Sequence, residues 1–153
     1  MGSIEDNALQ WTFDRLRINS SPPAGLAAVG GGLTSGSGGT PVVWAMMPSQ
    51  TAVYPTIVVS SLSTLDNPAF GPMTLPSPVV VWARIVDKNN AAPKSLSAYR
   101  AWMHGRLQTP PYAPEAGRVM CCRRIREHTV TDYESGVPFL QVGAEYEQTT
   151  DPT

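Results

Sequence analysis

The chain has 153 residues, 15% of them charged, and a net charge of −1 at pH 7. This length suits one domain and is too short for two domains with separate cores, so we expect a single domain over residues 1–153. The near-neutral charge argues against a protein whose whole surface binds nucleic acid, and leaves room only for a local basic stripe. Because the chain has 13 Gly and 15 Pro residues, we expect long irregular loops.

The cysteines and the N-terminal residues bear on the compartment. Cys121 and Cys122 are adjacent, and neighbouring strand positions point to opposite faces, so we expect no disulfide between them. The N-terminal region does not resemble a signal peptide, because it carries the acidic residues Glu5, Asp6 and Asp14 in place of a basic start followed by an apolar run. No apolar run approaches about 18 residues, so we expect no membrane helix. These features predict folding in a reducing cytoplasm.

The first third of the chain predicts one helix and one glycine-rich loop. Apolar residues at helical spacing predict a helix over residues 4–18, which the Pro22-Pro23 pair would end. Residues 30–40, GGGLTSGSGGT, predict a flexible loop, because ordering so many glycines costs backbone entropy. This run lacks the Gly-Lys-Ser/Thr ending of a phosphate-binding loop.

Three segments predict strands. Residues 41–47 (PVVWAMM), 53–61 (VYPTIVVSS) and 79–87 (VVVWARIVD) are rich in β-branched and aromatic residues. The continuous apolar start of the third segment indicates a central position in the sheet.

Residues 62–78 form a proline-rich connection with the sequence LSTLDNPAFGPMTLPSP. Four prolines prevent regular pairing in a sheet, so we expect a long extended loop. Loops of this length usually bind or dock in compact domains. Phe70, Met73 and Leu75 are therefore candidate contacts to another subunit or to a tube. The alternative, which we weigh equally, is that these side chains fold back onto the core.

The last third predicts a helix and a hairpin. Leu96, Tyr99, Met103 and Leu107 recur at helical spacing and predict a helix over residues 95–107. Residues 118–127 and 137–147 alternate in polarity, which predicts a hairpin with Arg124 and Arg126 on one face. A tail over residues 148–153 is a further candidate docking segment. The order α-β-β-β-α-β-β predicts an α+β fold, with a mostly antiparallel sheet of about five strands flanked by two main helices.

The sequence offers little for catalysis. Its two histidines are His104, in the second predicted helix, and His128, at the predicted hairpin tip. Cys122 with either histidine has the residue types of a nucleophile and base, but no flanking motif supports the pair. The cysteines have no second pair at metal-ligand spacing. We therefore expect no enzyme, no catalytic residues, no metal and no cofactor.

The clearest charge feature is an arginine cluster. Arg118, Arg123, Arg124 and Arg126 place four of the 11 basic residues within nine positions. One interpretation is a basic stripe that faces a polyanion, and a closed ring of subunits would multiply such a stripe around a passage for DNA. The favoured interpretation is pairing within the hairpin with one of three glutamates, namely Glu127, Glu145 or Glu147.

Four runs in order carry a resemblance to a known family: VVWAMMPSQTAVYPTIVVS, VVVWARIVDKN, SLSAYRAWMHGRL and YESGVPFLQVGAEYE. With the first helix and its Pro/Gly loop, they resemble the tail-terminator or tail-completion proteins of long-tailed bacteriophages. The last run is the most similar, because its Gly-Ala-Glu-Tyr ending stands where such proteins end their final strand. The resemblance spans nearly the whole chain and consists of the order of the elements and the residue types within them.

The resemblance implies an assembly role in the virion, at the junction of tail and neck, after assembly in the host cytoplasm. Six copies would close into a ring on the last ring of the tail tube, stop its polymerisation and join the neck or stopper protein of the head. DNA would pass through the lumen without sequence-specific binding, and no membrane would be involved. In that setting Arg123, Arg124 and Arg126 are candidate lumen-facing residues. The alternatives are a neighbouring neck protein, such as a head-completion or stopper protein, and a small cytoplasmic enzyme or ligand-binding domain.

Overall fold

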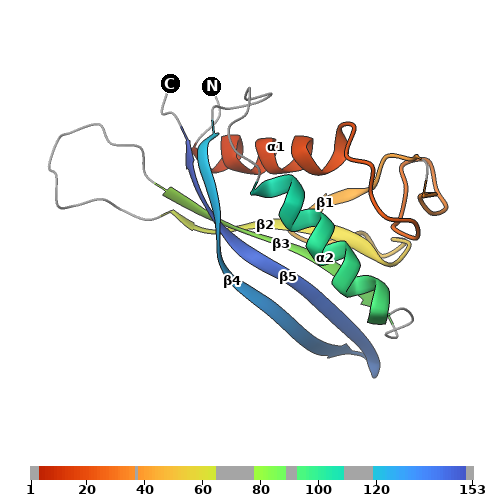
Figure 1. Cartoon of the computed structure of the whole chain (residues 1–153). Coiled ribbons are helices and arrows are strands. Elements are labelled where there is room, and N and C mark those ends of the chain that lie inside the picture. The colour runs from red at the N-terminus through yellow and green to blue at the C-terminus, as the bar shows by residue number, and fades with distance from the viewer. Residues whose placement is uncertain (1–3, 37, 65–77, 89–92, 109–118, 151–153) are drawn as a thin grey trace, which may run out of the picture.

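The structure, a computed structural model, describes residues 4–36, 38–64, 78–88, 93–108 and 119–150 (Figure 1). The elements in chain order are α1 (Ile4–Arg17), β1 (Val43–Ala45), β2 (Thr56–Thr64), β3 (Pro78–Lys88), α2 (Pro93–Leu107), β4 (Val119–Glu134) and β5 (Val137–Thr150). The strands form one mixed, mostly antiparallel sheet. The predicted α+β class and the order α-β-β-β-α-β-β are confirmed.

The sheet has the strand order β1-β2-β3-β5-β4. The predicted central position of the VVVWARIVD strand is confirmed, because β3 pairs with β2 on one side and with β5 on the other. β1 runs parallel to β2 and is only three residues long. The predicted strand over residues 41–47 is therefore shorter than expected: Met46 leaves the extended conformation with a φ of 72°.

Both helices cover the same face of the sheet (Figure 1). This face is apolar because alternate positions of the three middle strands point to it. Tyr146 and Ala144 of β5 are fully buried there, as the predicted alternation requires. The core consists of buried side chains from both helices and the sheet, including Ala8, Trp11, Leu16, Ile57, Val59, Val81, Ala83, Ile85, Leu96, Tyr99, Met103, Leu107, Val142, Ala144 and Tyr146.

The end of β5 is tied to α1 by a buried polar contact. Gln148 is fully buried and its Nε2 donates to Thr12 Oγ1 at 2.6 Å, while the Thr12 hydroxyl donates to the Ala8 carbonyl at 2.8 Å. The predicted docking tail over residues 148–153 is therefore wrong for its first part, because residues 148–150 belong to β5. Residues 151–153 lie outside the described part of the chain.

The glycine-rich segment is tied to its surroundings by main-chain hydrogen bonds. The Thr34 N–H donates to the Leu26 carbonyl at 2.7 Å, and the Val29 N–H donates to Thr40 O at 2.8 Å. Thr34 is buried, and its hydroxyl also donates to Pro23 O at 3.1 Å. The predicted loop over residues 30–40 is confirmed as irregular in its described residues, which belong to no helix or strand, and its flexibility stays a prediction.

The β4–β5 hairpin turns at Ser135 and Gly136. Their φ angles are 53° and 79°, and two positive φ values in a two-residue loop define a type I′ turn. The predicted position of His128 at the tip is wrong, because His128 pairs with Gly143 well inside the hairpin. The predicted strand ended too early because the alternation of polar and apolar residues is lost between His128 and Glu134, although β4 continues to Glu134.

Candidate functional site: the open sheet face and the end groove

The sheet face opposite the helices carries a stack built on Trp82 and Arg84. The Arg84 guanidinium lies 4.0 Å from the centre of the Trp82 ring, a cation–π contact. Arg84 also donates to Ser60 Oγ at 3.1 Å and to Met46 O at 3.2 Å. Burial lowers the pKa of Arg84, but a guanidinium stays charged in proteins. Arg84 thus places a fixed positive charge on this open face and joins β3 to the end of β1.

Glu145 is the acidic centre of the same face. Its Oε2 contacts His128 Nε2 at 2.7 Å and Arg126 Nε at 3.1 Å, and the His128 ring meets Trp82 edge-on at 5.8 Å between centroids. Trp82, Glu145 and Arg126 lie side by side on neighbouring strands, because Trp82 of β3 pairs with Glu145 of β5, and Glu145 pairs with Arg126 of β4. One carboxylate therefore serves two basic side chains.

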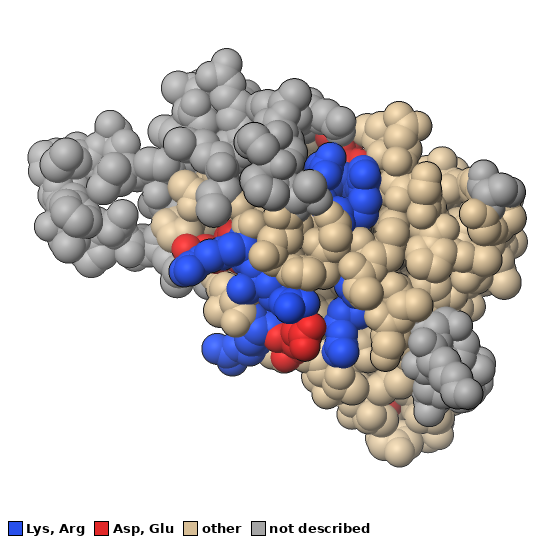
Figure 2. Space-filling model, in the orientation of Figure 1, with Lys and Arg blue, Asp and Glu red and all other residues tan. Residues whose placement is uncertain are grey.

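The remaining arginines of β4 are also paired. Arg123 contacts Glu147 at 3.2 Å, Arg124 contacts Glu127 at 2.7 Å, and Arg100 of α2 lies 4.0 Å from Glu127. The predicted pairing with glutamates of the hairpin is confirmed. Figure 2 shows the basic side chains with acidic ones among them. The three arginines of the cluster that the structure describes, Arg123, Arg124 and Arg126, therefore each have a glutamate partner within the chain.

A bulge in β4 separates two of the predicted lumen residues. Arg124 pairs with Tyr146, which faces the helices, whereas Arg126 pairs with Glu145 on the open face. Ile125 is the extra residue between them and is 44% exposed. The prediction that Arg124 and Arg126 share a face is wrong, because one inserted residue shifts the alternation. Whether these arginines face a lumen stays a prediction.

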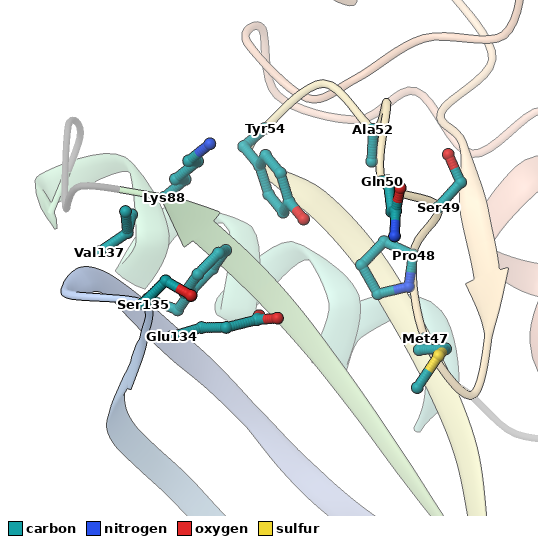
Figure 3. A pocket seen from close by; sticks show the side chains of 11 residues that line it. Met47, Pro48, Ser49, Gln50, Ala52, Tyr54, Lys88, Glu134, Ser135 and Val137 are labelled. Carbon is teal, nitrogen blue, oxygen red and sulfur yellow. The ribbon is translucent and has the colours of Figure 1, made fainter.

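A hollow lies at the end of the sheet where β3 stops. We call it the end groove, and its volume is about 550 Å³. One wall is the segment 47–54 and the other is the tip of the β4–β5 hairpin (Figure 3). The end groove is lined by Met47, Pro48, Ser49, Gln50, Ala52, Tyr54, Lys88, Glu134, Ser135, Val137 and Phe139.

The end groove combines an aromatic floor with a few polar groups. The rings of Tyr54 and Phe139 meet edge-on, with centroids 5.7 Å apart. Burial, and to a lesser degree the charge of Glu134, raise the pKa of Tyr54, so its hydroxyl stays a hydrogen-bond donor at neutral pH. Among the described residues neither Lys88 nor Glu134 forms an ion pair. The two side chains line the groove with one positive and one negative charge.

The histidine and cysteine side chains lie on two different faces. His104 of α2 shares a hydrogen bond of 3.1 Å with the Tyr146 hydroxyl, on the helix side. Burial is the main cause that lowers the pKa of His104 and raises that of Tyr146. Cys122 packs half-buried against the same core, whereas His128 lies on the open face. Of the two proposed Cys–His pairs, only Cys122 with His104 shares a side of the sheet.

Two absences hold for the described ranges of the chain. They contain no group of three His, Cys, Asp or Glu side chains that could hold a metal ion. Within the same ranges, no helix has the length and apolar character needed to cross a membrane. The predicted contact residues Phe70, Met73 and Leu75, and Arg118 of the arginine cluster, lie outside the described residues.

Exposed apolar side chains occur at both edges of the sheet. Beside β1 these are Val29, Leu33, Met46, Met47 and Val53, each at least 45% exposed. On β4, at the other edge, they are Ile125, Val130 and Tyr133, with Tyr133 68% exposed. We call these two sets the β1 patch and the β4 patch. Neither patch was singled out from the sequence, because alternation alone does not tell which strands lie at the edges.

The described residues form a two-layer α+β fold with one open sheet face and exposed apolar side chains at both sheet edges. Comparison of the sequence with models of known protein families finds no matching family, and comparison with curated proteins finds no matching relative.

Proposed function

We propose that the chain is a structural subunit of a bacteriophage tail, the tail terminator, which closes into a ring and caps the tail tube. In this role it stops tube polymerisation, contacts the neck or stopper protein on the head side and surrounds the DNA passage. It has no catalytic task. The resemblance of the sequence to tail terminators suggests the role, and the arrangement of the two apolar patches supports it.

The supporting observation is that the β1 patch and the β4 patch lie at opposite edges of the same sheet. A ring needs two different, complementary surfaces on each subunit, so that each copy contacts the next head to tail. Exposed Met46 and Met47 on one edge and exposed Tyr133 on the other are side chains that protein interfaces favour. A monomer would gain nothing from leaving them in water.

The arginines fit this role in a limited way. Arg123 and Arg126 are ion-paired, yet their side chains are 68% and 67% exposed. Exposed pairs are weak, about 0.2–1 kcal/mol each, and can be exchanged for other anionic partners. Repeated around a ring, these arginines would give a passage a mild attraction for phosphates without sequence readout.

The test is capping of a purified tail tube. Wild-type chain should bind tube ends as a ring in electron micrographs and should stop tube elongation. Tyr133→Asp places a charge in the β4 patch and should prevent ring formation. Ser97→Asp, on the exposed side of α2, is the matched control and should behave as wild type.

Two outcomes would contradict the proposal. If the wild-type chain neither binds the tube nor stops its growth, the terminator role is wrong. If it binds the head connector in place of the tube, it is a neighbouring neck protein.

A further inference from the structure

We propose that the end groove receives the proline-rich segment 65–77 of a second copy of this chain. The two surfaces that would meet between copies of the proposed ring are the end groove of one copy and the segment 65–77 of the next. Only the closure of the copies into a ring rests on the proposed function. The contact itself requires no tail tube.

The chemistry of the segment fits the groove. Its sequence, LDNPAFGPMTLPS, contains three prolines and four large apolar side chains in Leu65, Phe70, Met73 and Leu75. Proline fixes φ near −65° and favours the extended polyproline II conformation, which aromatic-lined grooves recognise. Tyr54 and Phe139 supply such a lining, and Met47 and Pro48 extend its apolar surface.

The polar groups of the groove fit as well. An extended proline-rich segment keeps its carbonyl oxygens as free acceptors, since it has no internal hydrogen bonds. Figure 3 shows Tyr54 and Gln50 on one wall and Lys88 at the end of β3, and all three side chains can donate hydrogen bonds. Asp66 is the only charged residue of the segment, and its sign is opposite to that of Lys88.

Geometry excludes the segment of the same copy. The segment is attached to Thr64 and Pro78, and Pro78 is at the far end of β3 from Lys88. β3 has 11 residues and therefore spans about 33 Å. A loop held at both ends extends at most half its contour, about 24 Å here. The segment cannot reach the groove at the other end of its own sheet, so a second copy must supply it.

The arrangement has a consequence for assembly. Each copy carries the segment at one end of its sheet and the groove at the other, which Figure 1 shows as the start of β3 and the tip of the β4–β5 hairpin. The contact is therefore head to tail, and repetition leads to a closed ring or an open chain. It would add to the contact between the β1 patch and the β4 patch, because Met47 belongs to both the β1 patch and the groove.

The first test uses a synthetic peptide of residues 64–78, titrated calorimetrically into the full chain at a concentration where the chain is monomeric. We expect saturable binding with one site per chain. Met47→Glu should weaken it about tenfold or more, because a carboxylate would replace a 74% exposed apolar lining residue. Met46→Glu is the matched control: Met46 is 58% exposed and does not line the groove, so affinity should change less than about twofold.

The second test is a charge exchange in the full chain, measured by sedimentation. Lys88→Glu and Asp66→Lys should each weaken self-association by about fivefold, and the two together should restore it. Absence of saturable peptide binding, or equal loss with Met46→Glu and Met47→Glu, would overturn the proposal. If the chain binds the peptide but does not cap tubes, the proposed contact stands and the proposed tail role is wrong. Failure of the one proposal can therefore be distinguished from failure of the other.

Discussion

Arg15 and Arg106 each donate their Nε hydrogen to the main-chain oxygen of the other, at 3.1 and 2.8 Å. Arg106 also donates to Ile18 O at 3.2 Å. Both arginines lie in the last turns of their helices, so α1 and α2 meet at their C-terminal ends. Carbonyls there have no partner within the helix, and a positive charge is favourable beside them. The two arginines thereby join the two helices that cover the sheet.

Replacing Arg106 should loosen this junction. We expect Arg106→Ala to lower the free energy of unfolding by about 2 kcal/mol, because two side-chain hydrogen bonds to carbonyls and a favourable charge are lost. Arg106→Lys should recover less than half, since an ammonium lacks the planar fork of donors. Urea denaturation measures both. Arg17→Ala, at an exposed position in the same turn as Arg15, is the control and should cost less than about 0.5 kcal/mol. Equal effects of Arg106→Ala and Arg17→Ala would contradict the capping role.

The second prediction concerns Gly143, which is crowded by the neighbouring strand, and Gly105, which has open space around it. A Cβ at Gly143 would lie 2.6 Å from Arg84 Cα and would also clash with the Ala83 carbonyl of the neighbouring strand. Gly143→Ala should therefore destabilise the fold by about 3 kcal/mol. A Cβ at Gly105, in α2, would meet nothing within 4 Å. Gly105→Ala should stabilise by about 0.5–1 kcal/mol, because alanine favours the helix. Thermal unfolding of the two variants measures both changes in stability. If Gly143→Ala is as stable as the wild type, β3 and β5 can move apart at this point.

His104 predicts a dependence of stability on pH. Burial, and then the nearby Arg124 charge, lower the pKa of His104 from its ordinary value of 6.5. The unfolded chain therefore binds the proton more readily, so stability is lost as pH falls below about 6.5. We expect the unfolding free energy to decrease between about pH 7.5 and 5.5, and to decrease less in His104→Gln. His128→Gln, on the open face, is the comparison variant. If the decrease of unfolding free energy with falling pH persists in His104→Gln and disappears in His128→Gln, the effect belongs to His128 and the prediction is wrong.

The alternation of polar and apolar residues was enough to predict the sheet, its central strand and the faces of β5. It failed in β4, where Ile125 is inserted between Arg124 and Arg126 and moves them to opposite faces. A bulge changes the register without leaving a mark in the pattern, since Ile125 suits a regular strand as well as a bulge.

The end groove shows a different limit of sequence reasoning. Its walls come from residues 47–54 and from the hairpin tip, which are some 80 positions apart, and they meet only after the sheet has formed. Tyr54 and Phe139 could not be paired in advance because each precedes or follows a proline and reads as the start of a strand. The hairpin turn, by contrast, has a signal in the sequence, because a Ser-Gly pair such as Ser135-Gly136 is typical of turns.

The arginine pairs predict a separation of stability from assembly. Arg123→Glu with Arg124→Glu should lower the free energy of unfolding by no more than about 2 kcal/mol, because both pairs are partly or largely exposed. Tube capping, or passage of DNA through the capped tail, should be lost to a greater extent, since the passage would become acidic.

A reversed pair is the control for this test. Arg123→Glu with Glu147→Arg keeps both the ion pair and the net charge, and it should preserve capping. If the double glutamate variant is unfolded at neutral pH, the arginines serve the fold of the hairpin and carry no assembly role.

The turn at the hairpin tip gives the last prediction. Ser135 has a φ of 53°, a conformation that asparagine tolerates well and that β-branched residues avoid. Ser135→Asn should therefore stabilise the tip by about 0.5 kcal/mol, and Ser135→Val at the same position should destabilise it by about 1–2 kcal/mol. The tip can open without unfolding the core, so amide exchange of Glu134 and Val137 is the appropriate measurement, alongside global denaturation. Exchange should be slower in Ser135→Asn and faster in Ser135→Val. Equal exchange in both variants would show that the left-handed conformation at Ser135 does not limit formation of the turn, and hence that the wall of the end groove is held from elsewhere.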